Sequence, residues 1–136
     1  MNYTSVMLLD EAKHMHRSTE NLPGLPAIEY RFRDEDFTSW IMRSGRAVII
    51  DEIGEDGAIN PDPDEGAPRF AKPHIVKVGV KSFAGLPLRG RGRLLGVVYL
   101  HSLHTGTFHG QLSLLVTFAN QVAIAVENAR LHEKVQ

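Results

Sequence analysis

Histidine is the residue whose number and spacing in this 136-residue chain point most directly to chemistry. There are seven histidines, and His101, His104 and His109 follow one another at intervals of three and five residues. Imidazole is a common metal ligand and a proton carrier near neutral pH. A neighbouring carboxylate or thiolate would complete a metal site, but neither lies between His101 and Phe108. We therefore interpret the three as solvated turn histidines and predict no metal site.

Three arginines, Arg89, Arg91 and Arg93, alternate with glycines in the run R-G-R-G-R. Arginine beside glycine allows close approach to phosphate groups, but no aromatic residue is interleaved that would stack on a base. The net charge of the chain is −1, without the basic excess typical of a nucleic-acid binder. We interpret the run as the tip of a hairpin and predict no nucleic-acid partner.

Carboxylates gather in the first half of the chain, above all in the Gly- and Pro-rich stretch 51–67. Residues 1–70 carry a net charge of −7 and residues 71–136 one of +6. Two acids of the stretch could in principle act as an acid–base pair, but solvated loop acids are far more common. The stretch also lacks the D-x-[DN]-x-[DN]-G spacing of a calcium loop. We predict an acidic surface loop whose charge complements the basic half of the same fold.

Signatures of catalysis are missing from the chain. There is no cysteine, which excludes a thiol nucleophile, a thiolate metal site and a thioether-linked cofactor. The patterns G-x-S-x-G, P-loop and H-E-x-x-H are also absent. No apolar run approaches the roughly 20 residues that span a bilayer, and no export signal opens the chain. We predict one non-catalytic domain over 1–136, soluble in the cytoplasm and not inserted in a membrane.

The elements that would position these side chains are mainly strands. Most of the predicted strands are continuously apolar and do not alternate between apolar and polar residues. For antiparallel strands, this pattern indicates a sheet covered on both faces. Pro87 has no N–H, so its strand is expected to be interrupted or locally unpaired there. Strands are predicted at Ser5–Asp10, Ile28–Arg33, Ala47–Ile50, Ser82–Leu88 and Leu94–Ser102, the last two joined at the arginine hairpin, with a loop at Leu22–Pro26.

Two helices are predicted, and the second is the strongest element of the sequence. The first begins after Asp34 or Asp36, either of which can cap it, and ends at Gly45. The second covers 111–136. Its apolar residues recur at alternating intervals of three and four, which forms a heptad seam, and further apolar residues lie off the seam, so two faces need partners. We predict the seam as a homodimer interface: Leu112, Leu115, Ala119, Val122, Val126 and Ala129.

Two stretches of the chain resemble the C-terminal half of GAF domains. Ser82, Pro87, Leu88 and Gly96 match the family's S…PL…G…G hairpin, and Gln121–Leu131 matches its Q-x-A-I-A-x-E-N-A-R-L helix. The resemblance implies an α+β, GAF/PAS-like fold. Its central antiparallel sheet has five or six strands, with terminal helices on one face and short helices and loops on the other. The family usually begins with a helix, whereas this chain opens on a strand.

The resemblance implies a sensory or regulatory module of a larger signalling protein. Members that reduce methionine sulfoxide or attach a bilin use cysteines, and the N-K-x(n)-F-x3-D-E motif of cyclic-nucleotide binders is not present here. We expect an unidentified small-molecule ligand and a relay through the C-terminal helix to an output domain. No cofactor is assigned, although some members hold haem through a histidine, for which His74 or His101 would serve. The alternative is a ligand-free dimerisation domain.

We expect a ligand pocket between the sheet and the variable acidic region, away from the C-terminal helix. Trp40 and Phe70 would offer apolar contact, and Tyr99, His74 and Asp51 would orient a ligand by hydrogen bonds. Each candidate is at least as readily explained as a core or surface residue. The full set is Trp40, Asp51, Phe70, His74, Phe83, Tyr99 and His101.

Overall fold

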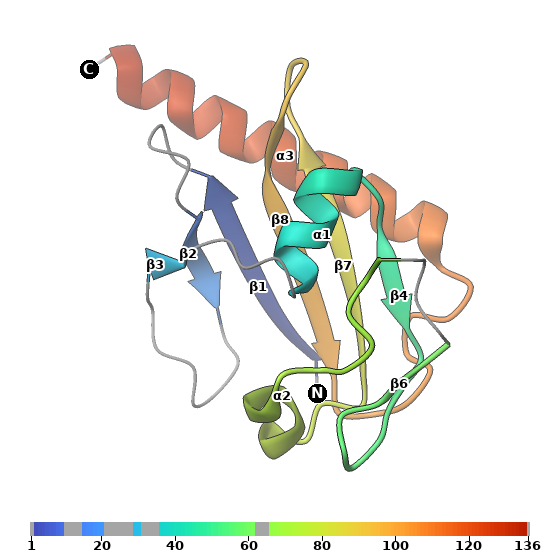
Figure 1. Ribbon diagram of the computed structural model, residues 1–136. Coiled ribbons are helices and arrows are strands. Elements are labelled where there is room, and N and C mark those ends of the chain that lie inside the picture. Colours follow the sequence, from blue (N-terminus) through green and yellow to red (C-terminus); the bar gives the residue numbers. More distant parts are fainter. Residues whose placement is uncertain (1, 10–14, 21–28, 31–35, 62–65, 136) are drawn as a thin grey trace.

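The computed structural model describes residues 2–9, 15–20, 29–30, 36–61 and 66–135. These residues form a six-stranded antiparallel sheet in the order β3-β2-β1-β8-β7-β4 (Figure 1). The longest strand, β8, has nine residues and lies between β1 and β7, which have eight residues each. The strands of this sheet are β1 (Asn2–Leu9), β2 (Met15–Glu20), β3 (Glu29–Tyr30), β4 (Val48–Ile50), β7 (Ser82–Arg89) and β8 (Leu94–Ser102). The predicted α+β fold with an antiparallel sheet of five or six strands is confirmed; the predicted loop Leu22–Pro26 lies outside the described residues.

The helices begin and end where their capping residues require. Helix α1 (Phe37–Ser44) starts after Asp36, whose side chain accepts a hydrogen bond from the Ser39 N–H, and stops at Gly45 with a φ of 70°. Helix α2 (Pro73–Val78) opens on a proline, which has no N–H to leave unsatisfied in a first turn. Helix α3 (Leu112–Val135) follows the turn that ends at Gly110. The predicted cap at Asp36 and the predicted end at Gly45 are confirmed.

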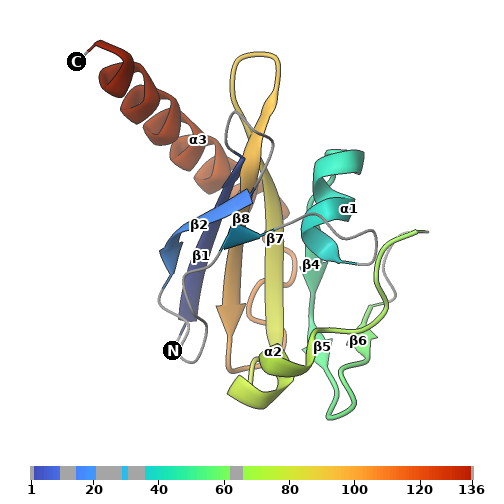
Figure 2. The ribbon, with the colours of Figure 1, turned by 60° about the vertical axis from the view of Figure 1, so that its left-hand side comes forward.

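Helices cover the sheet on both faces, as the continuous apolar strands predicted. Figure 2 shows α3 on one face and α1 on the other. Side chains of a strand alternate between faces, so Phe83 packs with the α1 side while Ala84 and Leu86 pack with α3. Strand β8 divides in the same way, with Tyr99 on the α1 side and Val98 on the α3 side. The core therefore consists of two clusters that share β7 and β8.

Two predictions about loops and strands need correction. Strand β7 runs without a break through Pro87, which pairs with Val97 of β8. The proline is tolerated because the pairing of β7 with β4 covers only 83–85, so Pro87 needs no donor toward that neighbour. The acidic stretch is also more ordered than a plain loop, since β5 (Glu52–Ile53) and β6 (Ile59–Asn60) form a small antiparallel hairpin within it.

The sequence analysis predicted no segment that could span a membrane, but helix α3 contains one that is long and apolar enough to be a candidate. Its segment Leu112–Ala129 is long and apolar enough to cross a bilayer by length and composition alone. Core helices of soluble proteins meet the same criterion, so the finding is weak evidence for a membrane span. In the structure, α3 packs Leu115, Ala119 and Ala123 onto the sheet.

Candidate functional site

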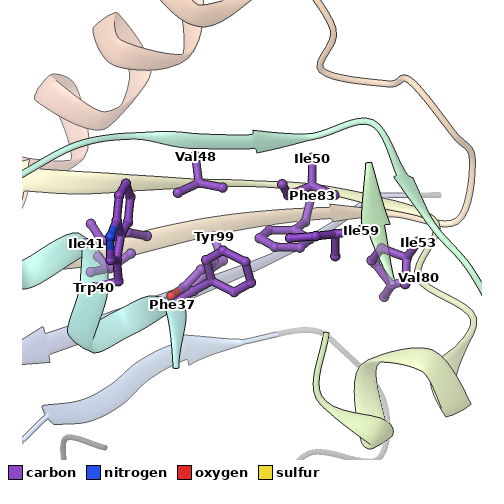
Figure 3. Packing of buried hydrophobic residues seen from close by; sticks show 11 residues of the cluster. Phe37, Trp40, Ile41, Val48, Ile50, Ile53, Ile59, Val80, Phe83 and Tyr99 are labelled. Carbon is purple, nitrogen blue, oxygen red and sulfur yellow. The ribbon is translucent and has the colours of Figure 1, made fainter. Parts of the chain in front are cut away.

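Four of the seven predicted ligand residues come together in one buried cluster between α1 and the sheet. Trp40 comes from α1, Phe83 from β7, and Tyr99 and His101 from β8, and each is less than 9% exposed. Figure 3 shows Trp40, Phe83 and Tyr99 within the layer of apolar side chains under α1. The expected location, on the sheet face away from α3, is where these four lie.

The rings of this cluster are in direct contact. Phe37 of α1 meets Phe83 edge-on, with ring centroids 5.2 Å apart at 74°. Tyr99 and His101 are stacked, with centroids 5.8 Å apart at 26°, and His101 also lies 6.1 Å from Phe83. Such edge-to-face and offset arrangements stabilise a core beyond the burial of its area. The cluster is an apolar surface with a few polar atoms at its edge.

The hydroxyl of Tyr99 is the most firmly placed polar group of the site. It forms a buried hydrogen bond of 2.8 Å with Thr38 Oγ1 of α1. Burial raises the pKa of Tyr99 well above its usual range; the negative charge of Asp36 acts in the same direction and the bond to Thr38 opposes it. Tyr99 therefore stays a neutral phenol at physiological pH, suited to orienting a ligand and unsuited to act as a base.

The other three predicted ligand residues lie outside this cluster or are not described. The side chain of Asp51, which follows β4, forms a hydrogen bond of 2.9 Å with His109 Nδ1 through Oδ2, and its backbone oxygen accepts a bond from the Gly106 N–H. Phe70 is 60% exposed. His74 is the second residue of α2, but its side chain lies outside the described part. Asp51 thus fastens the turn before α3 instead of lining the aromatic cluster.

Residues that sequence reasoning missed complete the site at the N-terminal end of α1. Phe37, Thr38 and Ser39 are buried along with the capping Asp36. In the sequence these residues indicated only the start of a helix, because the aspartate of a D-x-x-S segment can accept a hydrogen bond from a backbone N–H of the first turn. Gly85 is the other omission: a Cβ there would lie 2.8 Å from atoms of both Ile41 and Tyr99. Gly85 thus allows α1 and the Tyr99 ring to lie close to β7, and only the three-dimensional structure shows this.

The six residues predicted as a dimer seam do not share one environment. Leu115 and Ala119 are buried against the chain's own sheet, and Val122 and Val126 pack partly on the same cluster. Leu112 is half exposed, and Ala129 is exposed. Most of the seam therefore faces the chain's own sheet. Further large apolar residues of α3, which lie off the seam, are exposed: Leu114, Val116, Phe118 and Ile124. A homodimer through α3 stays a prediction that these exposed residues would have to carry.

Among the described residues, no three His, Asp or Glu side chains converge in a way that would hold a metal ion. His101 stacks on Tyr99, and His109 is engaged with Asp51. His104 and His109 are exposed and lie outside the helices and strands, as predicted. The prediction of a solvated turn histidine is wrong for His101, which belongs to β8 and is 7% exposed.

Substituting Gly85 by alanine tests how tightly α1 lies on the sheet. The added Cβ would meet the Ile41 Cδ1 and Tyr99 Cε1 atoms at 2.8 Å, so α1 or the Tyr99 ring must move. We expect the free energy of unfolding to fall by about 1–3 kcal/mol. Urea denaturation measures this, with Gly54→Ala as control, because the nearest atom there is the carboxylate of Asp56 at the end of a movable side chain. Equal losses in both variants would contradict the close approach.

Substituting Tyr99 by phenylalanine tests the bond that ties β8 to α1. The variant leaves the buried Thr38 hydroxyl without its partner, and we expect a loss of about 1–2 kcal/mol in unfolding free energy. Thr38→Val should cost a similar amount. The double variant should cost clearly less than the two losses added together, because both polar groups are then removed. Additive losses would show that the bond contributes little.

Comparisons with known proteins agree on the fold and on the kind of protein. The family model described as GAF domain matches residues 1–126. A hybrid signal transduction histidine kinase G of Dictyostelium discoideum is 28% identical over 114 residues, 76% of this chain, and the chain spans 3% of its length.

Among solved structures, the GAF domain of a two-component sensor histidine kinase from Bacillus halodurans has a TM-score of 0.72 at 14% identity. The comparison covers 96% of this chain and 84% of that one. A free methionine-R-sulfoxide reductase from Neisseria meningitidis, solved with its substrate, has a TM-score of 0.66 at 17% identity, covering 96% and 70% of the two chains. At these identities the two structures share the fold alone with this chain.

Proposed function

This chain belongs to the GAF domain family, and from that premise we propose that it is a non-catalytic sensory module of a larger, cytoplasmic signalling protein. A small molecule binds at the aromatic cluster under α1. Its binding is relayed through α3 to an output domain of the parent protein. The chain's similarity to domains of sensor histidine kinases supports this class of function.

The observation that carries the proposal is the sharing of β7 and β8 by the two core clusters. Tyr99, which contacts α1, is the direct neighbour in sequence of Val98, on which α3 packs. Interiors are close-packed and transmit strain instead of absorbing it. A ligand that moves Tyr99 or Phe83 therefore shifts the strands on which α3 rests. The ligand changes the position of α3 only by as much as its affinities for the two arrangements differ.

Catalysis has no part in the proposal. The reductases that share this fold belong to a branch in which, by the resemblance stated above, cysteines perform the reduction, and this chain has no cysteine. Tyr99 is held as a neutral phenol. The site is accordingly one that binds and orients a ligand.

A thermal-shift screen followed by hydrogen exchange tests the proposal. Amino acids, amines, nucleotides, haem and small anions are screened for a rise in the melting temperature of the isolated chain. A binding compound should slow amide exchange in α1 and β8 and also change exchange in α3. A compound that binds without affecting α3 contradicts the relay, and the failure of every compound contradicts the sensory role.

The alternative is a ligand-free dimerisation domain, and two observations favour it. The rings of Phe37 and Phe83 already fill the space under α1 by contacting each other. The exposed apolar residues of α3, such as Leu114 and Phe118, are suited to pair with a second copy. A homodimer through α3 belongs to both versions, so only ligand binding separates them.

A further inference from the structure

Two polar groups at the start of α1 are buried without satisfying their hydrogen-bonding capacity. Asp36 is 6% exposed and Ser39 is 3% exposed. One carboxylate oxygen of Asp36 accepts the Ser39 N–H at 2.9 Å. The other oxygen, Oδ2, and the Ser39 Oγ atom have no hydrogen-bond partner among the described residues. Leaving buried polar groups in this condition is destabilising, most of all for a charged group, so the arrangement requires a reason.

Lys72 brings a positive charge close to the Asp36 carboxylate but lies too far from Oδ2 for a hydrogen bond with it. Its ammonium nitrogen lies 3.8 Å from Asp36 Oδ2, and its side chain is 46% exposed. That distance is beyond the usual range for N–H···O bonds. Because the side chain of Lys72 is much more exposed than that of Asp36, it lies on the solvent side of the carboxylate. Lys72 is also the residue directly before α2, so this ion pair links α2 to the start of α1.

The surroundings of the carboxylate are those of the aromatic cluster. Phe37 follows Asp36 in the chain and contacts the Phe83 ring. Asp36 and Tyr99 are both buried, and Thr38, two residues after Asp36, forms a hydrogen bond with the Tyr99 hydroxyl, so the carboxylate and the phenol share one poorly solvated region. An acceptor-only carboxylate, an unused hydroxyl and aromatic faces together favour a cationic donor attached to an apolar body. They disfavour an anion, which the Asp36 charge would repel.

We propose that Asp36 and Ser39 form the head-group subsite for a small ligand with a primary ammonium group, and that Lys72 occupies the place of that group in the unliganded domain. The proposal rests on the sensory function proposed above and names the class of its ligand. The ligand's ammonium donates to Asp36 Oδ2 and Ser39 Oγ, and its apolar body lies against the aromatic cluster. Lys72 is displaced, and α2 loses its ion pair to α1. Occupancy is thereby coupled to the position of α2.

Three probes of one shape test the charge requirement. 2-Phenylethylamine, 2-phenylethanol and 3-phenylpropionate share a phenylethyl body and differ in carrying a cationic, neutral or anionic head. Calorimetric titration of the whole chain should detect binding of the amine, and binding at least tenfold weaker for the other two. The proposal is overturned if the alcohol or the acid binds as tightly as the amine. It is also overturned if the amine binds neither the wild type nor Lys72→Gln.

Two variants separate the roles of the residues. Asp36→Asn should weaken amine binding at least tenfold while α1 stays folded, since asparagine is as good a helix cap as aspartate. Lys72→Gln keeps a polar side chain, shorter by one atom, but removes the competing charge, so it should tighten amine binding several-fold. Weaker or unchanged binding in Lys72→Gln overturns the placeholder role. If the broader screen finds ligands whose affinity is insensitive to Asp36→Asn, the ammonium subsite is wrong while the sensory function stands; if no compound binds, both fall.

Discussion

Replacing Ala119 by glutamate is expected to lower the free energy of unfolding by about 3–5 kcal/mol, the cost of an uncompensated buried charge. Ala119 is 1% exposed and lies where α3 meets β7, in the cluster that contains Leu86 and Leu88. A carboxylate at this position would have apolar neighbours on every side that faces the sheet. Domains of this size are stable by about 5–15 kcal/mol, so the variant should melt roughly 10 °C or more below the wild type.

The control places a glutamate at Asn120, the next residue of the same helix, which is exposed and lies away from the face of Leu114 and Phe118. Asn120→Glu should change the unfolding free energy by less than about 0.5 kcal/mol. Urea unfolding of both variants is measured at several protein concentrations, so that any contribution from association is visible. A loss of the same size in both variants would mean that α3 does not rest on the sheet as described.

The helix seam shows what a periodic pattern can and cannot decide. The alternating spacing correctly predicted one long C-terminal helix, because apolar spacing of three and four is a local property of the chain. It did not decide which apolar face meets the sheet, since Leu115 and Phe118 are both apolar and lie on adjacent parts of the helix surface. That choice is made by the fit of α3 against β7, where small residues of the helix such as Ala119 and Ala123 allow close packing.

The candidate site was predicted in its sheet residues and in Trp40 of α1, and it was missed in the residues at the start of α1. Phe83, Tyr99 and His101 lie at every second place on adjacent strands, so the predicted hairpin already placed them on one face. Thr38 and Ser39 gave no such signal, because the meeting of α1 with β8 depends on a long-range contact. Asp51 was misplaced for the opposite reason: its position at a strand end suggested the site, but its partner His109 lies 58 residues further on.

Charging the exposed stripe of α3 is expected to dissociate a dimer while leaving the fold intact. Leu114 is 66% exposed and Phe118 is 40% exposed, and residues four apart lie on one face of a helix. In a homodimer through this face, both side chains are buried in each of the two copies. Burying one Leu or Phe side chain contributes roughly 1.5–3 kcal/mol. The double variant Leu114→Glu, Phe118→Glu should therefore weaken association at least about 100-fold.

Light scattering after size exclusion measures the result as a molar mass that falls by half, and circular dichroism checks that the fold is retained. Asn120→Glu is the control, because Asn120 is exposed on α3 about 140° around the helix from Leu114 and Phe118, by the ~100° turn per residue. Val122→Glu is unsuitable, since Val122 packs partly on the sheet and its loss would mix unfolding with dissociation. A wild type that is monomeric at high micromolar concentration, or a double variant of unchanged mass, removes this face of α3 as the dimer interface.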